Sequence, residues 1–130
     1  MATNELGKDK TMTQLDKTTQ NAIWNNYRRN TLASLALPMI VARRLENQVT
    51  DSTTREEERE LYKEAATYSG QANQIIEMAQ DAYNAIYPER KGNRFEQELV
   101  ALARKAVTEA LFNEINVEQA CQKIIENELT

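Results

Sequence analysis

The chain has 130 residues, of which 41% are hydrophobic and 28% charged, so it is long enough to bury one core and too apolar for an intrinsically disordered protein. It has no histidine and one cysteine, Cys121, which excludes Ser-His and Cys-His catalytic pairs, histidine-ligated zinc and an intrachain disulfide. Its three glycines, Gly7, Gly70 and Gly92, lie too far apart for a phosphate-binding loop. We therefore expect no catalytic residue and no cofactor.

Residues 1–12 are polar and are expected to form a flexible tail before a single helical domain that spans residues 13–130. The segment from Met1 to Gln14 lacks the apolar core of a secretory signal. The longest apolar-rich run, Thr31 to Ala42, is roughly half as long as a membrane span. These features predict a cytoplasmic or intravirion protein without a membrane partner.

Charge is unevenly distributed along the chain. Residues 1–50 contain seven Lys/Arg and four Asp/Glu, whereas residues 51–130 contain nine and sixteen. Such asymmetry can indicate an end of the molecule that faces a polyanion. The alternative is a helix whose solvent-exposed face is simply more basic.

The first predicted helix begins near Thr13 and carries one apolar face followed by a denser apolar stripe whose members are three or four positions apart. The first face is formed by Leu15, Ala22, Ile23 and Tyr27, and the denser stripe by Leu32, Leu35, Met39, Ala42, Leu45 and Val49. Pro38 lies within the stripe, and a proline inside a helix removes one hydrogen bond and clashes with the preceding turn. We therefore expect a kink or a break between Asn30 and Pro38.

One cluster in this helix, WNNYRRN at residues 24–30, combines aromatic, amide and basic side chains. Arginine presents a planar fork of donors that fits phosphate, and tryptophan and tyrosine offer stacking surfaces for bases. A second arginine pair follows the predicted kink, so the two pairs could face each other across the bend. The candidate residues for an anionic ligand, a nucleotide or a nucleic acid, are Trp24, Tyr27, Arg28, Arg29, Arg43 and Arg44. The alternative interpretation is that the aromatic residues are core anchors surrounded by solvated arginines.

The clearest periodicity follows a capping-box pattern at Thr54 and Glu57. Pro88 should end this helix, so residues 54–87 are predicted to form one helix that continues through Gly70. Its apolar residues alternate spacings of three and four, as in a heptad seam, and should pack closely on another helix within the chain or across a dimer. The candidate self-association residues are Leu61, Ala65, Tyr68, Ala72, Ile75, Ala79 and Ile86.

Two shorter helices are predicted after a turn at residues 89–92. Asn93 is the expected N-cap of a helix that continues to about Asn113, and Asn116 is the expected N-cap of the last helix. Cys121 falls on the apolar face of that helix and should act as a small hydrophobe. No segment alternates like a strand, so we predict an all-α helical bundle of four to five helices with one long heptad-bearing central helix.

Acidic side chains are the remaining candidates for metal ligands. Glu57 with Glu60, and Glu77 with Asp81, distantly resemble the carboxylates of the all-helical nucleotide pyrophosphohydrolases, which pair Glu-x-x-Glu on one helix with Glu-x-x-Asp on the next. That resemblance would imply metal-dependent hydrolysis of nucleotides. Here the second pair is spaced differently, and both pairs fall on one predicted helix, about 25 Å apart at 1.5 Å per residue. We therefore expect no metal site.

These patterns suggest three alternative hypotheses for the function. The first is a non-enzymatic helical interaction protein that associates with itself through the 54–87 helix; an accessory protein of a phage or mobile element would fit this description. The second is a binder of a nucleotide or nucleic acid through the arginine-rich first half. The third is the metal-dependent nucleotide hydrolase.

Overall fold

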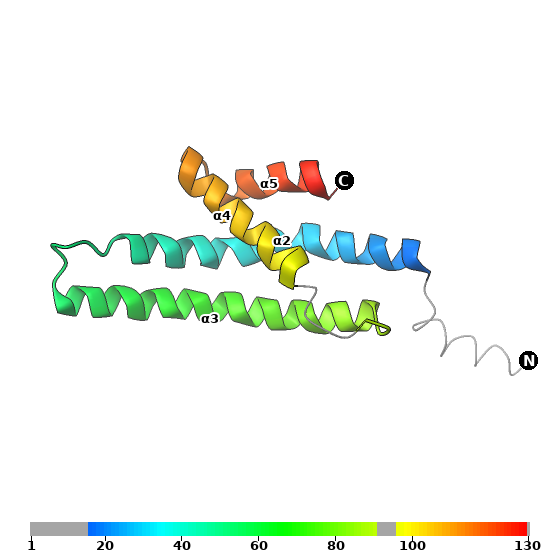
Figure 1. The fold of residues 1–130 in the computed structure, drawn as a ribbon, viewed down its shortest axis with the longest axis horizontal. Helices are drawn as coiled ribbons and strands as arrows, with labels where there is room; N and C mark the ends of the chain where they lie inside the picture. The colour runs from blue at the N-terminus through cyan, green and yellow to red at the C-terminus, as the bar shows by residue number, and fades with distance from the viewer. Residues whose placement is uncertain (1–15, 91–95, 130) are drawn as a thin grey trace, which may run out of the picture.

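The computed structural model describes residues 16–90 and 96–129, and all regular structure in those ranges is helical (Figure 1). The elements are α2 (Lys17–Asn47), α3 (Arg55–Ile86), the π-helical turn η1 (Glu96–Val100), α4 (Ala101–Asn113) and α5 (Val117–Glu128). The predicted all-α bundle is confirmed, with four α-helices in the described ranges. The predicted tail at residues 1–12, the helix start near Thr13 and the cap at Asn93 lie outside these ranges.

The helices α2 and α3 form a long antiparallel hairpin and lie side by side along most of their length (Figure 1). Both begin with a side-chain cap. The carboxylate of Asp16 accepts a hydrogen bond from the backbone N–H of Thr19 at 2.7 Å, and this bond lowers the pKa of Asp16. Thr54 and Glu57 form the predicted capping box of α3, which ends just before Pro88. Side-chain caps and Pro88 therefore set three of the four helix ends in the hairpin, namely both starts and the end of α3.

The helices α4 and α5 form a second, shorter hairpin that packs on α2 (Figure 1). The side chain of Asn116 caps α5, as predicted, by accepting a hydrogen bond from the N–H of Gln119 at 2.8 Å. By contrast, α3 packs mainly on α2, with a smaller contact to η1. The hairpin tip, which comprises the turn at residues 48–54 and the adjoining helix ends, projects beyond α4 and α5 (Figure 1).

The core surrounds α2, because this helix contacts all the others. Its largest fully buried side chains are Trp24, Leu32, Leu35, Ile40, Tyr83, Tyr87, Leu99 and Cys121. Burial raises the pKa of the Cys121 thiol to about 11, so the sulfur stays protonated and unreactive at neutral pH. The predicted role of this cysteine as a small hydrophobe agrees with its burial.

Pro38 lies inside α2, which continues without interruption from Lys17 to Asn47. Of the predicted kink or break, the break is therefore wrong. A proline inside a helix costs about 3 kcal/mol, whereas burying one large aliphatic side chain contributes about 1.5–3 kcal/mol. Leu35 and Ile40 on either side of Pro38 are both fully buried. Their burial against the other helices offsets the missing hydrogen bond.

Gly70 lies in the middle of α3, where the helix is continuous as predicted. A Cβ atom added at this position would meet no other atom within 4 Å. We expect Gly70→Ala to raise the free energy of unfolding by about 0.5–1 kcal/mol, because alanine loses less backbone entropy in a helix. Urea denaturation followed by circular dichroism measures this change. An unchanged or lower unfolding midpoint would contradict it.

Candidate functional site

Trp24, the predicted stacking surface, is a core residue with an exposed fraction of 2%. Its ring stacks on Tyr27 at a centroid distance of 5.5 Å and meets the ring of Tyr83 edge-on at 5.1 Å. Its indole N–H donates to the carboxylate of Glu98 at 3.0 Å. Trp24 therefore has no free face for a nucleobase, and the core-anchor interpretation is the one observed.

Arg28 connects α2 to the same π-helical turn. Its guanidinium donates to the backbone oxygen of Glu98 at 3.4 Å and to the side chain of Asn25, and its Nε atom is buried without a partner. Together with Trp24, Arg28 holds η1 on α2, because both side chains bind Glu98. The predicted aromatic–arginine cluster thus serves the packing of α2 against η1.

A second polar network lies at the base of the hairpin, opposite the hairpin tip. The buried Gln20 amide donates to the backbone oxygen of Ile86 at 2.8 Å and to the carboxylate of Glu89 at 3.2 Å. The hydroxyl of Tyr87 donates to Asn21 at 2.5 Å, and burial raises the pKa of this tyrosine. These bonds join residues at least 66 positions apart in the chain and fix how α2 and α3 align.

The two predicted arginine pairs do not face each other, because α2 does not bend back on itself. Arg28 and Arg43 are 15 residues apart on one continuous helix, or about 22 Å at 1.5 Å per residue. Arg29 is exposed, and Arg44 lies beside the turn between α4 and α5. The structure thus separates the predicted anionic-ligand residues rather than gathering them.

Arg43 lines a groove of about 220 Å³ where α2, α3 and the start of α4 meet. We call it the arginine groove. Its lining residues are Met39, Ala42, Arg43, Glu46, Ser69, Ala72, Asn73, Ile76, Val100 and Arg104. Within the described residues, neither Arg43 nor Arg104 makes a hydrogen bond or an ion pair. Arg104 was not predicted, because nothing in its sequence neighbourhood places it opposite α2.

The predicted self-association seam is buried within the chain. Ala65, Ala72 and Ala79 are buried, and the other seam residues are half-buried. This side of α3 packs on α2, so the seam is occupied within the chain. A self-association surface on α3 must therefore lie outside the seam.

The side of the α2–α3 hairpin that faces away from the arginine groove carries exposed hydrophobic side chains. Ile23, Leu37 and Met78 have exposed fractions of 42%, 51% and 65%. Residues nine positions apart point in opposite directions on an α-helix, because nine residues make two and a half turns. Ile23 therefore points away from the buried Leu32, and Met78 away from Ser69 in the arginine groove.

By the same spacing, half-buried Val41 points away from Leu32. With Leu37 at its edge, this set defines what we call the back face of the hairpin: Ile23, Leu37, Val41 and Met78. Between Ile23 and Val41 it is about 27 Å long at 1.5 Å per residue.

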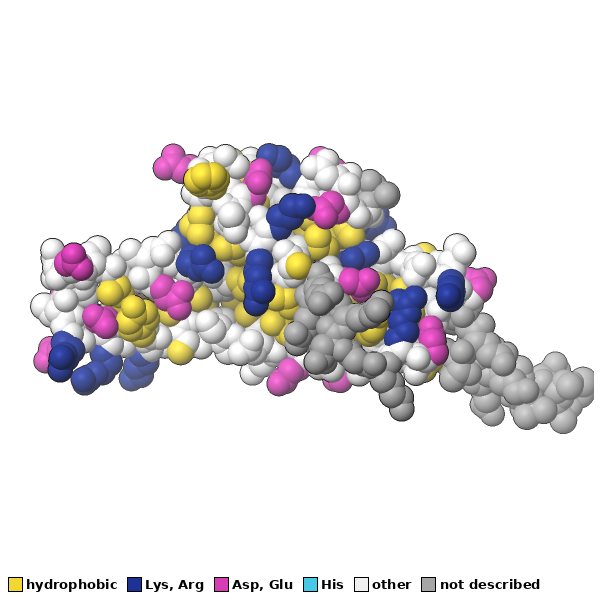
Figure 2. All heavy atoms as spheres, viewed as in Figure 1, with side chains coloured by type: hydrophobic (Ala, Val, Ile, Leu, Met, Phe, Trp, Pro, Cys, Tyr) yellow, Lys and Arg dark blue, Asp and Glu magenta, His cyan; other side chains and the backbone are white. Residues whose placement is uncertain are grey.

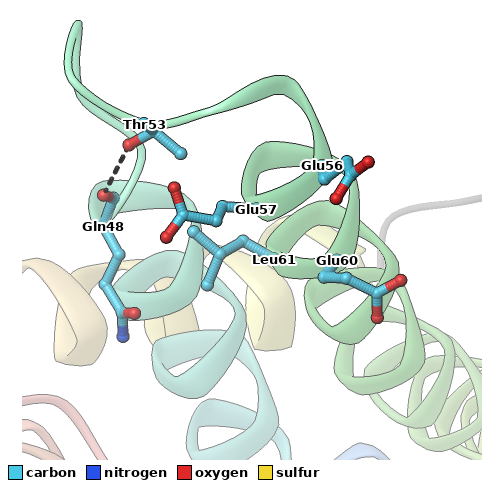
Figure 3. A pocket seen from close by; sticks show the side chains of 6 residues that line it. All are labelled: Gln48, Thr53, Glu56, Glu57, Glu60 and Leu61. Carbon is cyan, nitrogen blue, oxygen red and sulfur yellow. Dashed lines mark hydrogen bonds between the residues drawn. The ribbon is translucent and has the colours of Figure 1, made fainter.

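Three acidic side chains are among those that line a hollow at the hairpin tip (Figure 3). Glu57 points toward Gln48, whereas Glu56 and Glu60 point away from it, so the three carboxylates diverge (Figure 3). The backbone N–H of Thr54 binds Glu57 at 2.9 Å and lowers its pKa. No group of three metal-ligating side chains comes together in the described part of the chain.

The second acidic pair, Glu77 and Asp81, lies on the same uninterrupted helix α3 as Glu57 and Glu60. Glu60 and Glu77 are about 25 Å apart at 1.5 Å per residue. The two pairs thus cannot meet within one chain, and the arrangement found in the pyrophosphohydrolases is not formed here.

No helix within residues 16–90 and 96–129 is long and apolar enough to cross a membrane. No protein-family model matches the chain, and no curated protein or solved structure is similar enough to count as a match. What the protein does must therefore be inferred from its own surface.

Proposed function

We propose that this chain is a non-catalytic helical interaction protein that associates with a second copy of itself through the back face of the α2–α3 hairpin. The observation that carries this proposal is the exposure of Ile23, Leu37 and Met78 on one side of the two-helix layer formed by α2 and α3. Several exposed apolar side chains on one face of a protein favour an interaction surface there.

A second copy fits this face for two reasons. Two-fold dimers are the commonest oligomers, and their interface pairs the same patch on both subunits. An apolar patch is complementary to itself. Two hairpins stacked face to face would form a four-helix arrangement of two layers, as in helical bundles. Because the seam is already buried on α2, dimerisation needs no opening of the hairpin.

Sedimentation velocity over a range of protein concentrations tests the proposal. We expect the wild-type chain to pass from monomer to dimer, and Ile23→Lys and Met78→Lys each to weaken the dimer at least tenfold. A lysine placed in an apolar contact must be desolvated without a partner. Phe112→Lys is the matched control, because Phe112 is 86% exposed on α4, away from the back face.

Circular dichroism should show the same helix content in all three variants, since each substitution is made at an exposed position. A wild-type protein that stays monomeric at high concentration would refute self-association. So would a dimer that both back-face variants retain, because another surface would then hold it.

A further inference from the structure

We infer that the arginine groove is a docking site for an acidic amphipathic helix of a partner protein, whose carboxylates lie between Arg43 and Arg104. This surface is separate from the back face, because the two lie on opposite sides of the α2–α3 hairpin. It therefore goes beyond the self-association proposed above.

The charge of the groove indicates an anionic occupant. Arg43 and Arg104 enter it from different helices, and neither has a hydrogen-bonding or ion-pair partner among the described residues. Glu46 is the one acidic residue that lines the groove, so the lining carries a net positive charge in a chain whose net charge is −4. Two guanidinium groups beside an apolar floor suit a carboxylate that arrives together with aliphatic side chains.

The apolar floor and its size favour side chains of a protein over a free nucleotide. Met39, Ile76 and Val100 supply the floor, and no aromatic ring lines the groove to stack on a base. The volume of about 220 Å³ is also smaller than that of typical small-molecule pockets, which is about 300–1,000 Å³. One or two side chains of a helix laid across the groove would fill it.

Hydrophobic side chains continue from the groove along the hairpin toward the tip (Figure 2). Tyr62, an exposed residue, lies two turns before Ser69 and so on the same side of α3 as the groove. Figure 2 shows hydrophobic side chains along the line between α2 and α3 on this face, beyond the edge of α4. From Ile76 to Tyr62 this line measures about 21 Å at 1.5 Å per residue, which is the length of a four-turn helix.

The probes for this site are two capped 18-residue helical peptides in which leucine recurs every third or fourth position. One carries glutamate at the flanking positions, and the other carries glutamine. We expect the glutamate peptide to shift the amide resonances of residues 39–46, 69–76 and 100–104 in the full chain. The glutamine peptide should bind at least tenfold more weakly, and added salt should weaken the glutamate peptide.

Substitutions at the groove give effects of opposite sign. Arg43→Gln and Arg104→Gln should each weaken the glutamate peptide about threefold to fivefold, the range of a partly exposed ion pair. Glu46→Gln should tighten it about twofold, because a competing carboxylate is removed. Arg44→Gln is the matched control: it lies one residue from Arg43 but outside the groove, and it should leave the affinity unchanged.

Other results would overturn the inference. Equal affinity for the two peptides, or no binding of either at millimolar concentration, would show that the groove does not select an acidic helix. If 4-methylpentanoate shifts the same resonances as strongly as the glutamate peptide, the site is one for small carboxylates instead. If Arg43→Gln abolishes the dimer without any peptide, the occupant is a second copy.

The Ile23→Lys and Met78→Lys variants should bind the peptide normally, which separates this test from that of the back face.

Discussion

Trp24→Ala should lower the free energy of unfolding by about 3–5 kcal/mol, the range for removing a buried tryptophan. The substitution leaves a cavity between α2 and α3, because Tyr27 and Tyr83 both pack on the ring. It also removes the N–H that binds Glu98 at 3.0 Å, so η1 loses one of its ties to α2. Domains of this size have a total stability of about 5–15 kcal/mol, so much of it would be lost.

Chemical denaturation followed by circular dichroism measures this loss, because the variant has no tryptophan fluorescence. Trp24→Phe should cost less than Trp24→Ala, since it keeps most of the ring contacts and loses only the bond to Glu98. Phe112→Ala, at an exposed aromatic position, should change the stability by less than about 0.5 kcal/mol. A loss below about 1 kcal/mol in Trp24→Ala would mean that the ring is not buried as described.

Ala79→Leu is expected to cost about 1–3 kcal/mol, because its methyl group is fully buried where α3 approaches α2. The larger side chain can be placed only if the two helices move apart or neighbouring side chains leave their preferred rotamers. Thermal denaturation of the variant measures the loss.

Ala66→Leu provides the matched comparison for this prediction. Ala66 lies on the same helix but is exposed, so the same added volume projects into solvent. Its effect should be within about 0.5 kcal/mol. Equal melting temperatures for the two leucine variants would show that α3 does not approach α2 closely at Ala79.

Features that depend on neighbouring residues were predictable from the sequence. The capping box at Thr54, the end of α3 before Pro88 and the cap at Asn116 each involve residues within four positions of one another. Such signals act through backbone groups close in sequence, so they need no knowledge of the rest of the fold. For the same reason the length of α3 was predicted to within one residue at each end.

Features that depend on distant residues were not predictable. Glu98 binds Trp24 across 74 positions, and Gln20 binds Ile86 across 66. Periodicity shows that a face is apolar but not which helix covers it, so nothing indicated that Arg104 would join Arg43. The break expected before Pro38 is absent for a related reason: the packing that keeps α2 continuous comes from helices elsewhere in the chain.

The two ends of the α2–α3 hairpin differ in how strongly they are tied to the rest of the molecule. The base is held by Gln20, Tyr87 and the contacts of η1, so it can separate only when much of the core comes apart. The hairpin tip projects beyond α4 and α5, so these two helices do not cover it (Figure 1). Opening of the tip therefore costs less free energy than global unfolding, and the hairpin frays from the turn inward as a separate cooperative unit. Stability in this protein is thus graded along a single pair of helices.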